Sequence, residues 1–227
     1  MAMADPLDET EADDFIDKVS DFTDDGYPIE IAALLQQKPQ LINAKKYGGN
    51  PLHWAETLSV AEVLYNAKPS LIDETDRFGN LPIHNAALNG RLSVLQFLVR
   101  QRPSSIHSKG QYGWTPLLRA CVEGHLSVIQ FLFAQHSDTL DARDDNGGTA
   151  LHTLAIWGGD EFVTCAQWIV QQRPSMVHMK DNYGETPLEL AKISMKVKLA
   201  AAIQKAMEEY EGGAIDGKGG ANEMDPN

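Results

Sequence analysis

The sequence predicts an all-α fold, a solenoid of stacked helix-turn-helix units. The first observation is a short pattern that recurs five times in the 227 residues, at intervals of 31 to 37 residues. The second is an apolar pattern at helical spacing that follows each of the first four copies. The third is the composition, with 43% hydrophobic and 22% charged residues, which is that of a chain able to bury a core.

The recurring pattern is the start of a helix behind a tight turn. Each copy begins with a glycine, where the turn requires a positive φ that glycine adopts without strain. The proline suits the first helical turn, because the N–H that it lacks would have no partner there. Thr115, Thr149 and Thr186 are good N-caps and Asn50 can replace them, but Leu81 cannot, so its helix should begin less firmly. The copies are GGNPLHWA at 48–55, GNLPIHNAA at 79–87, GWTPLLRAC at 113–121, GGTALHTLA at 147–155 and GETPLELA at 184–191.

A second helix and a third short block follow each of the first four copies. The second helices are LSVAEVL at 58–64, LSVLQFL at 92–98, LSVIQFL at 126–132 and VTCAQWI at 163–169. The third blocks are PSLID at 69–73, PSSIH at 103–107, SDTLD at 137–141 and PSMVH at 174–178. Proline ends a helix by steric clash and by its missing donor, so most of these second helices should stop before it. Upstream, residues 29–43 match the second helix and third block, and residues 13–22 supply a candidate first helix.

These features resemble the ankyrin repeat, a unit of about 33 residues with a Thr-Pro-Leu-His-x-Ala signature. The resemblance covers about residues 12–211 and implies β-hairpin fingers between the units. It predicts one domain of six units, the first and last of which are atypical caps. The units are 12–43, 44–74, 75–108, 109–142, 143–179 and 180–211. An acidic tail, 1–11, and a Gly-rich tail, 212–227, are expected to be disordered.

Charge is concentrated at the two ends of the chain. The net charge is -13, and residues 1–25 hold ten acids and one base, while residues 205–227 hold six acids and two bases. The body between them has 16 acids and 16 bases, which argues against a nucleic-acid partner, because that affinity comes mostly from Lys and Arg. The acidic ends either provide solubility or contact a basic partner.

No residue pattern indicates an enzyme, a metal site or a cofactor. The resemblance implies that signature residues His53, His84 and His152 make structural hydrogen bonds between repeats. The other histidines have no zinc-ligand spacing and are interpreted as turn or surface residues. They are His107, His125, His136 and His178. Cys121 and Cys165 are interpreted as buried small residues, and no nucleophile motif or phosphate-binding loop is present.

The chain is therefore expected to have no small-molecule substrate. It lacks the run of about 18 apolar residues that spans a bilayer, and no secretory signal is recognisable, so no membrane partner is predicted. A cytoplasmic or nuclear location fits two cysteines in a reducing compartment.

The resemblance implies that a protein partner binds the concave face, formed by the fingers and by the inner surface of the first helices. Candidate partner-binding residues in the fingers are Lys46, Tyr47, Arg77, Phe78, Asn80, Gln111, Tyr112, Trp114, Asp145, Asn146, Asn182, Tyr183 and Glu185. Those in the helices are Leu88, Asn89, Val122, Glu123, Ile156 and Trp157. The helical pattern does not require aromatic rings at finger tips, and such rings are enriched at interfaces. The alternative is that neighbouring rings shield one another.

The predicted function is a non-catalytic protein–protein interaction module that serves as an adaptor, a scaffold or a subunit of a larger complex. The alternative is an inhibitor or an assembly chaperone that masks a surface of one target. Trp114 and Trp157 are the expected binding anchors, whereas Trp54 and Trp168 are interpreted as packing residues. Asn43 also resembles a site of asparagine hydroxylation in some ankyrin repeats.

Overall fold

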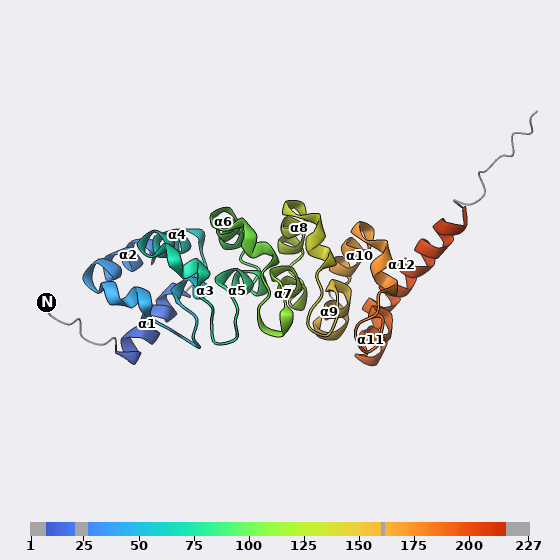
Figure 1. Cartoon of the computed structure of the whole chain (residues 1–227), viewed down its shortest axis with the longest axis horizontal. Helices are drawn as coiled ribbons and strands as arrows, with labels where there is room; N and C mark the ends of the chain where they lie inside the picture. Colours follow the sequence, from blue (N-terminus) through green and yellow to red (C-terminus); the bar gives the residue numbers. More distant parts are fainter. Residues whose placement is uncertain (1–7, 21–26, 160–161, 217–227) are drawn as a thin grey trace, which may run out of the picture. The chain divides into compact units, whose positions relative to one another are not determined.

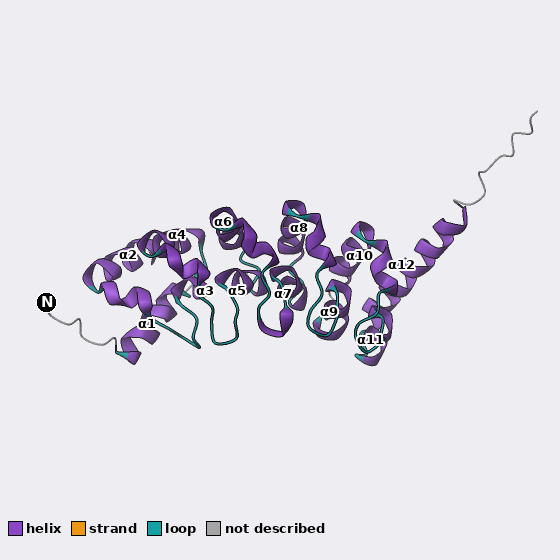
Figure 2. Ribbon diagram, viewed as in Figure 1, coloured by secondary structure: helices purple, strands orange, loops and turns teal. Residues whose placement is uncertain are grey.

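The chain is built of helices joined by turns and short loops. The computed structural model describes residues 8–20, 27–159 and 162–216, and no strand occurs within these ranges (Figure 2). The helices group into two compact units, each of which contains several repeats. They are called the first unit, which ends at Asp145, and the second unit, which begins at Asn146. Among the described residues, no helix combines the length and the hydropathy that a membrane crossing requires.

Each unit consists of helix pairs followed by short 3-10 helices (Figure 1). The first unit contains α1 (Glu9–Val19), α2 (Tyr27–Gln37), α3 (Pro51–Trp54), α4 (Leu58–Ala67), α5 (Pro82–Leu88), α6 (Leu92–Gln101), α7 (Pro116–Val122) and α8 (Leu126–Gln135). The second contains α9 (Ala150–Trp157), α10 (Val163–Gln172), α11 (Pro187–Ile193) and α12 (Val197–Asp216). The 3-10 helices are η1 (Pro39–Asn43), η2 (Pro69–Asp73), η3 (Pro103–His107), η4 (Gln111–Gly113), η5 (Ser137–Asp141) and η7 (Pro174–His178).

Stacking of like helices forms the core of each unit. In the first unit α5 packs between α3 and α7, and α6 packs between α4 and α8, so the helices form two rows (Figure 1). Leu52, Ile83 and Leu117 are buried at equivalent positions of the first row. In the second unit α9 packs on α11 and α10 packs on α12, around buried Leu151 and Ile169. No single pair can bury its apolar face, so the stability comes from these neighbour contacts.

The helix boundaries follow the signals in the sequence. Asn50 and Thr115 cap α3 and α7, and their side-chain oxygens accept the N–H groups of Leu52 and Leu118 at 3.0 and 3.4 Å. Leu81 provides no side-chain cap, as predicted, but α5 still begins at the equivalent proline. Helices α2, α4, α6 and α10 end one residue before a Lys-Pro or Arg-Pro pair, and the proline then opens a 3-10 helix.

Both predicted tails are shorter than expected. Helix α1 runs from Glu9 to Val19. It begins at Glu9 because the Asp8 carboxylate caps it by accepting the Thr10 N–H at 3.1 Å. Residues 9–11, assigned to the acidic tail, are therefore helical, and the first helix starts earlier than residue 13. At the other end α12 extends to Asp216, so the Gly-rich tail cannot begin at residue 212. Residues 1–7 and 217–227 lie outside the described ranges.

The fingers are tight turns rather than β-hairpins with extended arms. Within the described ranges the backbone forms one isolated antiparallel bridge, between Lys46 and Gly49. Each finger is only a few residues long, which is too short for a ladder of strand pairs. The expected hairpins are thus reduced to their turns, and these turns carry the candidate binding residues.

Candidate functional site

Two finger tips in the first unit hold tyrosines in a left-handed backbone conformation. Tyr47 has φ 52° and is followed by Gly48 with φ 81°, the combination of a two-residue type I′ turn. Tyr112 has φ 60° and is followed by Gly113 with φ 70°. A non-glycine residue in this region costs about 1–2 kcal/mol. These turns project the two rings, which are 58% and 60% exposed.

An aspartate holds the finger between the tyrosine tips. The Asp76 carboxylate accepts the N–H groups of Phe78 and Asn80 at 2.8 and 2.9 Å and the Asn80 side-chain amide at 3.0 Å. The Arg77 N–H also donates to the Tyr47 carbonyl at 3.4 Å, which joins two neighbouring fingers. Phe78 remains 42% exposed at the tip. The Asp76 carboxylate is therefore committed to shaping the finger.

Trp114 does not leave the stack, so the expectation that it is an exposed anchor is wrong. Its side chain is only 8% exposed. The indole lies 4.9 Å from the Arg119 guanidinium and 5.7 Å, edge to face, from the Tyr112 ring. Its N–H donates to Asp144 at 3.4 Å. Burial of the ring follows from these neighbours, which lie up to 30 positions away in the sequence.

Asn80 is also buried, and it joins two fingers. Its side-chain oxygen accepts the Gln111 N–H at 3.0 Å and an Arg119 amino group at 2.9 Å. Lys46 is engaged as well, since it forms an ion pair with Asp17 of α1, a hydrogen bond that raises the pKa of Lys46. The side chains of Asn80 and Lys46 are therefore engaged in contacts within the fold.

The remaining candidates differ in exposure. In the first unit the exposed ones are Tyr47, Arg77, Phe78, Asn89, Tyr112, Glu123 and Asp145, and the half-buried ones are Leu88, Gln111 and Val122. In the second unit the exposed ones are Asn146, Ile156, Trp157, Asn182 and Tyr183, and Glu185 is half-buried. Trp157, at the end of α9, is 57% exposed, and its role as a binding anchor stays a prediction.

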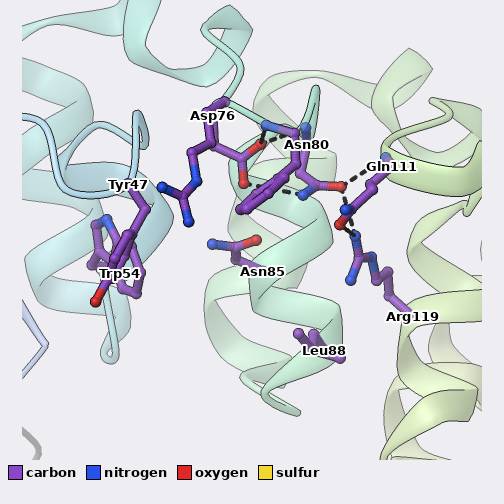
Figure 3. Close-up of a pocket in the computed structure, with 10 residues that line it drawn as sticks. Tyr47, Trp54, Asp76, Asn80, Asn85, Leu88, Gln111 and Arg119 are labelled. Atoms are coloured by element: carbon purple, nitrogen blue, oxygen red, sulfur yellow. Dashed lines mark hydrogen bonds between the residues drawn. The ribbon is translucent and has the colours of Figure 1, made fainter. Parts of the chain in front are cut away.

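Some of the candidates in the first unit, together with neighbouring residues, enclose a groove of about 280 Å³. It is lined by Tyr47, Trp54, Asp76, Arg77, Phe78, Asn80, Asn85, Leu88, Gln111 and Arg119 (Figure 3). Asn85 and Leu88, on α5, lie between Tyr47 and Trp54 on one side and Gln111 and Arg119 on the other (Figure 3). The groove thus spans three successive repeats.

Sequence reasoning missed part of this groove. Trp54, Asn85 and Arg119 occupy the same variable position, x, of the Thr-Pro-Leu-His-x-Ala signature in successive copies. The interpretation of Trp54 as a packing residue was incomplete, because it is half-buried and lines the groove. The missed signal is the register, since equivalent positions in stacked helices face the same side.

Two guanidinium groups dominate the charge of the groove. Arg119 is 8% exposed and forms no ion pair among the described residues, and its Nε atom is buried without a hydrogen-bond partner. Burial lowers the pKa of Arg119. Arg77 lies over the Tyr47 and Phe78 rings, at 5.0 and 4.5 Å from their centroids, and also lacks an ion pair within the described ranges. Among the described residues no carboxylate forms an ion pair with either group, although the charge of Asp76 acts favourably on Arg119 from within the groove.

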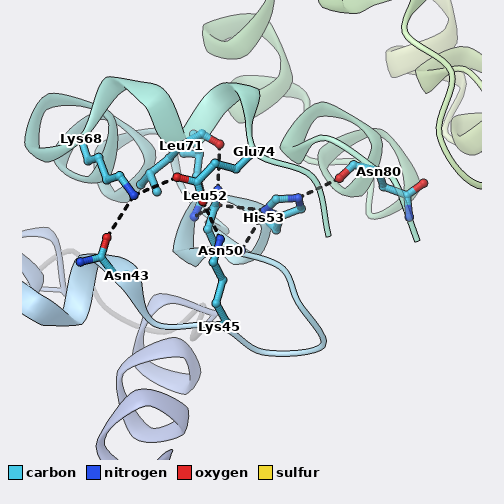
Figure 4. A network of polar contacts seen from close by, with 9 residues as sticks. All are labelled: Asn43, Lys45, Asn50, Leu52, His53, Lys68, Leu71, Glu74 and Asn80. Carbon is cyan, nitrogen blue, oxygen red and sulfur yellow. Dashed lines mark hydrogen bonds and ion pairs between the residues drawn. The ribbon is translucent and has the colours of Figure 1, made fainter. Parts of the chain in front are cut away.

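A separate polar network binds the second repeat to the third (Figure 4). Asn50 donates to the Leu71 carbonyl at 2.8 Å, and His53 donates through Nε2 to the Asn80 carbonyl at 2.9 Å. Glu74 pairs with Lys45 and Lys68 at 2.5 and 2.8 Å. Although burial opposes it, these hydrogen bonds lower the pKa of Glu74 to about 2. The network is structural.

The signature histidines make the hydrogen bonds that the resemblance implied. In each copy Nδ1 accepts the backbone N–H at the start of its own helix, at 3.0 to 3.2 Å. Nε2 donates to a carbonyl of the next repeat: Asn80 for His53, Ser108 for His84 and Glu185 for His152. Since both nitrogens are occupied, each imidazole joins the start of its own helix to the next repeat.

Burial of His84 predicts a loss of stability in mild acid. Desolvation lowers the pKa of His84 to about 4, whereas an unfolded histidine titrates near 6.5. The unfolded chain therefore binds the proton first, and the stability that His84 contributes falls as the pH drops from about 6.5 to about 4. The whole difference amounts to about 3 kcal/mol.

Urea unfolding at pH 7, 5.5 and 4 measures this effect. A His84→Gln variant should show a smaller decrease in unfolding free energy than wild type, and His107→Gln, at an exposed position, should not differ from wild type. Equal slopes for all three proteins would contradict the prediction. The contribution of Glu74 is lost only at lower pH, between about 4.5 and 2.

One further cluster could hold a metal ion within the described ranges. His107, His136 and Asp138 are exposed, and their ligand atoms lie within 4.8 Å of one another. The two imidazoles contact edge to face with centroids 5.3 Å apart. They take the places held one repeat earlier by Asp73 and Arg102, which form an ion pair. The two histidines are therefore explained by a contact between neighbouring repeats, without a metal ion.

Comparison with known proteins identifies repeats within this architecture. The model of the family described as ankyrin repeats (3 copies) matches residues 56–144, which run from α4 through the finger that follows η5. Among curated proteins, none matches the chain.

Proposed function

This chain is an ankyrin-repeat protein, and we propose that it acts as a non-catalytic module that binds another protein through the finger tips and groove of its first unit. Ankyrin repeats are generally protein–protein interaction modules. The proposed surface, here called the finger face, comprises the groove lining, which includes Tyr47, Arg77, Phe78 and Leu88, together with the exposed Tyr112 outside the groove.

The strained tyrosines are the single observation that carries the proposal. Tyr47 and Tyr112 both adopt a positive φ, yet more than half of each side chain is exposed to water. Glycine or asparagine would make the same turn at lower cost, so the turn itself does not account for a ring at these tips, and the contacts of each ring with a neighbouring tryptophan leave more than half of it exposed. Backbone strain that folding does not require is typical of functional sites. Tyrosine is also enriched among residues that dominate binding energy.

A variant of the finger face tests the proposal. Tyr47→Ser with Phe78→Ser removes two exposed rings, so the melting temperature should change by only a few degrees. Partner binding should weaken by at least about thirtyfold if these rings are hot spots. Quantitative affinity purification from the source cells, compared with the wild-type chain, measures the loss.

The matched control is Ile29→Ser, because Ile29 is 76% exposed on α2 and lies outside the groove. It should retain the same partners as wild type. The proposal fails if the finger variant retains its partners in full, or if the control loses them equally.

The second unit supports an adaptor over an inhibitor that masks a single target. It carries exposed apolar residues of its own, the adjacent Ile156 and Trp157 at the end of α9 and Tyr183 on its finger. Large exposed apolar residues that cluster are typical of interaction sites. An adaptor should recover two proteins, one lost with the finger variant and one lost with Trp157→Ser. A single protein lost with both variants would favour the inhibitor or assembly chaperone.

The cytoplasm or the nucleus is the location that we propose. Its support is that the chain has only two cysteines, Cys121 and Cys165, both buried, which is too few for the disulfide framework of a small secreted protein.

A further inference from the structure

We infer that the groove of the first unit receives a glutamate or aspartate side chain from an acidic segment of the partner protein. This inference rests on the proposed function, because it names the chemistry of the partner at the finger face. Its basis is that two arginines of the groove form no ion pair among the described residues and share a single acidic neighbour, Asp76, although acids outnumber bases in the chain by 32 to 19.

Arg119 is the inner cation. Its Nη2 group donates to Asn80 Oδ1 at 2.9 Å, and its guanidinium is stacked on Trp114, so the side chain is held in one orientation. Nη1 makes no hydrogen bond among the described residues. Unlike Nε, which is buried, Nη1 is accessible to a ligand. A buried charge without a counter-charge is costly. A carboxylate that entered the groove would supply that counter-charge.

Arg77 is the outer cation, on the finger above α5. Stacking on Tyr47 and Phe78 leaves the edge of its planar guanidinium, which carries the donors, free for a carboxylate. The Asp76 carboxylate pairs with neither arginine, because its oxygens already accept three hydrogen bonds within its own finger, although its charge acts on Arg119. The groove therefore has two cations, whereas its one acidic side chain is occupied.

The floor of the groove suits the peptide on either side of that acid. Leu88 is half-buried and offers an apolar contact. Asn85 lies beside it, and its side-chain amide makes no hydrogen bond within the described ranges, so it can pair with a peptide backbone (Figure 3). Trp54 adds a ring whose Nε1 donor has no partner. An acidic residue next to an aliphatic residue matches this lining.

A displayed library of random dodecapeptides, selected on the immobilised full chain, tests the inference. Parallel selections use Arg77→Gln and Arg100→Gln. Both remove one positive charge from an exposed arginine, but Arg100, on α6, does not line the groove. Arg119 is left unchanged because it is buried and its replacement could prevent folding. Peptides selected on wild type and on Arg100→Gln should share Asp or Glu at one position, and this enrichment should disappear on Arg77→Gln.

The best peptide is then measured by fluorescence anisotropy. Replacing its shared acid with the corresponding amide should weaken binding by at least about tenfold, as expected for a partly buried charge pair. A version with an amidated C-terminus should bind as well as the free acid. If the amidated peptide alone loses affinity, the groove reads a terminal carboxylate and the inference of a side chain is wrong.

The outcomes separate this inference from the proposed function. Peptides without acidic enrichment that still lose affinity for the Tyr47→Ser, Phe78→Ser variant would overturn the carboxylate inference and leave the docking surface in place. Peptides that bind that variant as well as wild type would count against both. Acidic enrichment that persists on Arg77→Gln would also overturn the inference, because the charge would then be read elsewhere.

Discussion

Replacing Arg91 with methionine should lower the free energy of unfolding by about 3–5 kcal/mol, the usual loss when one partner of a buried ion pair is removed. The Arg91 and Glu56 side chains are 10% and 4% exposed and form an ion pair. Burial lowers the pKa of Arg91 to about 10, so the guanidinium is still protonated at neutral pH. Without it, the Glu56 carboxylate would remain buried with no counter-charge.

The same arginine compensates for a shortened helix. Helix α3 ends at Trp54, three residues earlier in its repeat than α5 or α7 in theirs, and Arg91 donates to the carbonyls of His53 and Ala55 at 3.4 Å. His125, one repeat later at the equivalent position, bonds the Leu88 carbonyl at the end of α5 at 2.9 Å. Arg91 therefore satisfies the end of a helix as well as a carboxylate.

Chemical denaturation of three variants tests this role. The double variant Arg91→Met, Glu56→Leu removes both charges and should lose much less than Arg91→Met alone. Arg100→Met, at an exposed position, should stay within about 0.5 kcal/mol of wild type. A loss below about 1 kcal/mol for Arg91→Met would show that the pair is solvated in the folded protein.

Trp114→Ala should destabilise the fold by about 3–5 kcal/mol, as expected for deletion of a large buried ring. The indole packs on Arg119 and Tyr112 and bonds Asp144, so the change also removes the support of the inner cation. Trp157→Ala should change the unfolding free energy by less than about 0.5 kcal/mol, because most of that ring is exposed. The two tryptophans, which looked alike in the sequence, should thus separate clearly.

Thermal and urea unfolding of the two single variants measure this difference. The conservative change Trp114→Phe keeps an aromatic ring on Arg119 and should recover part of the loss. Equal, small effects of Trp114→Ala and Trp157→Ala would mean that the Trp114 ring is not packed as described.

Local signals were enough to predict the helices and most of their ends. Pro82 and Pro116 open helices because they need no N–H partner there, and Pro103 follows the end of α6 because it cannot continue that helix. The predicted acidic tail is too long because Asp8, an acidic residue of the tail, is also the N-cap of α1, a role that its residue type permits. The hairpin arms were overestimated, since a family resemblance gives the type of connection but not its length.

The sequence by itself determined the repeat, the all-α class and the positions of the signature histidines, because these depend on patterns that recur within each unit. Only the tertiary structure decided which side chains remain available for binding. Trp114 is covered in part by Asp144 of the next repeat, while Trp54, Asn85 and Arg119 converge on one groove from three successive repeats. Such exposure depends on contacts between stacked units, 30 or more residues apart in the chain, which a pattern within one repeat does not specify.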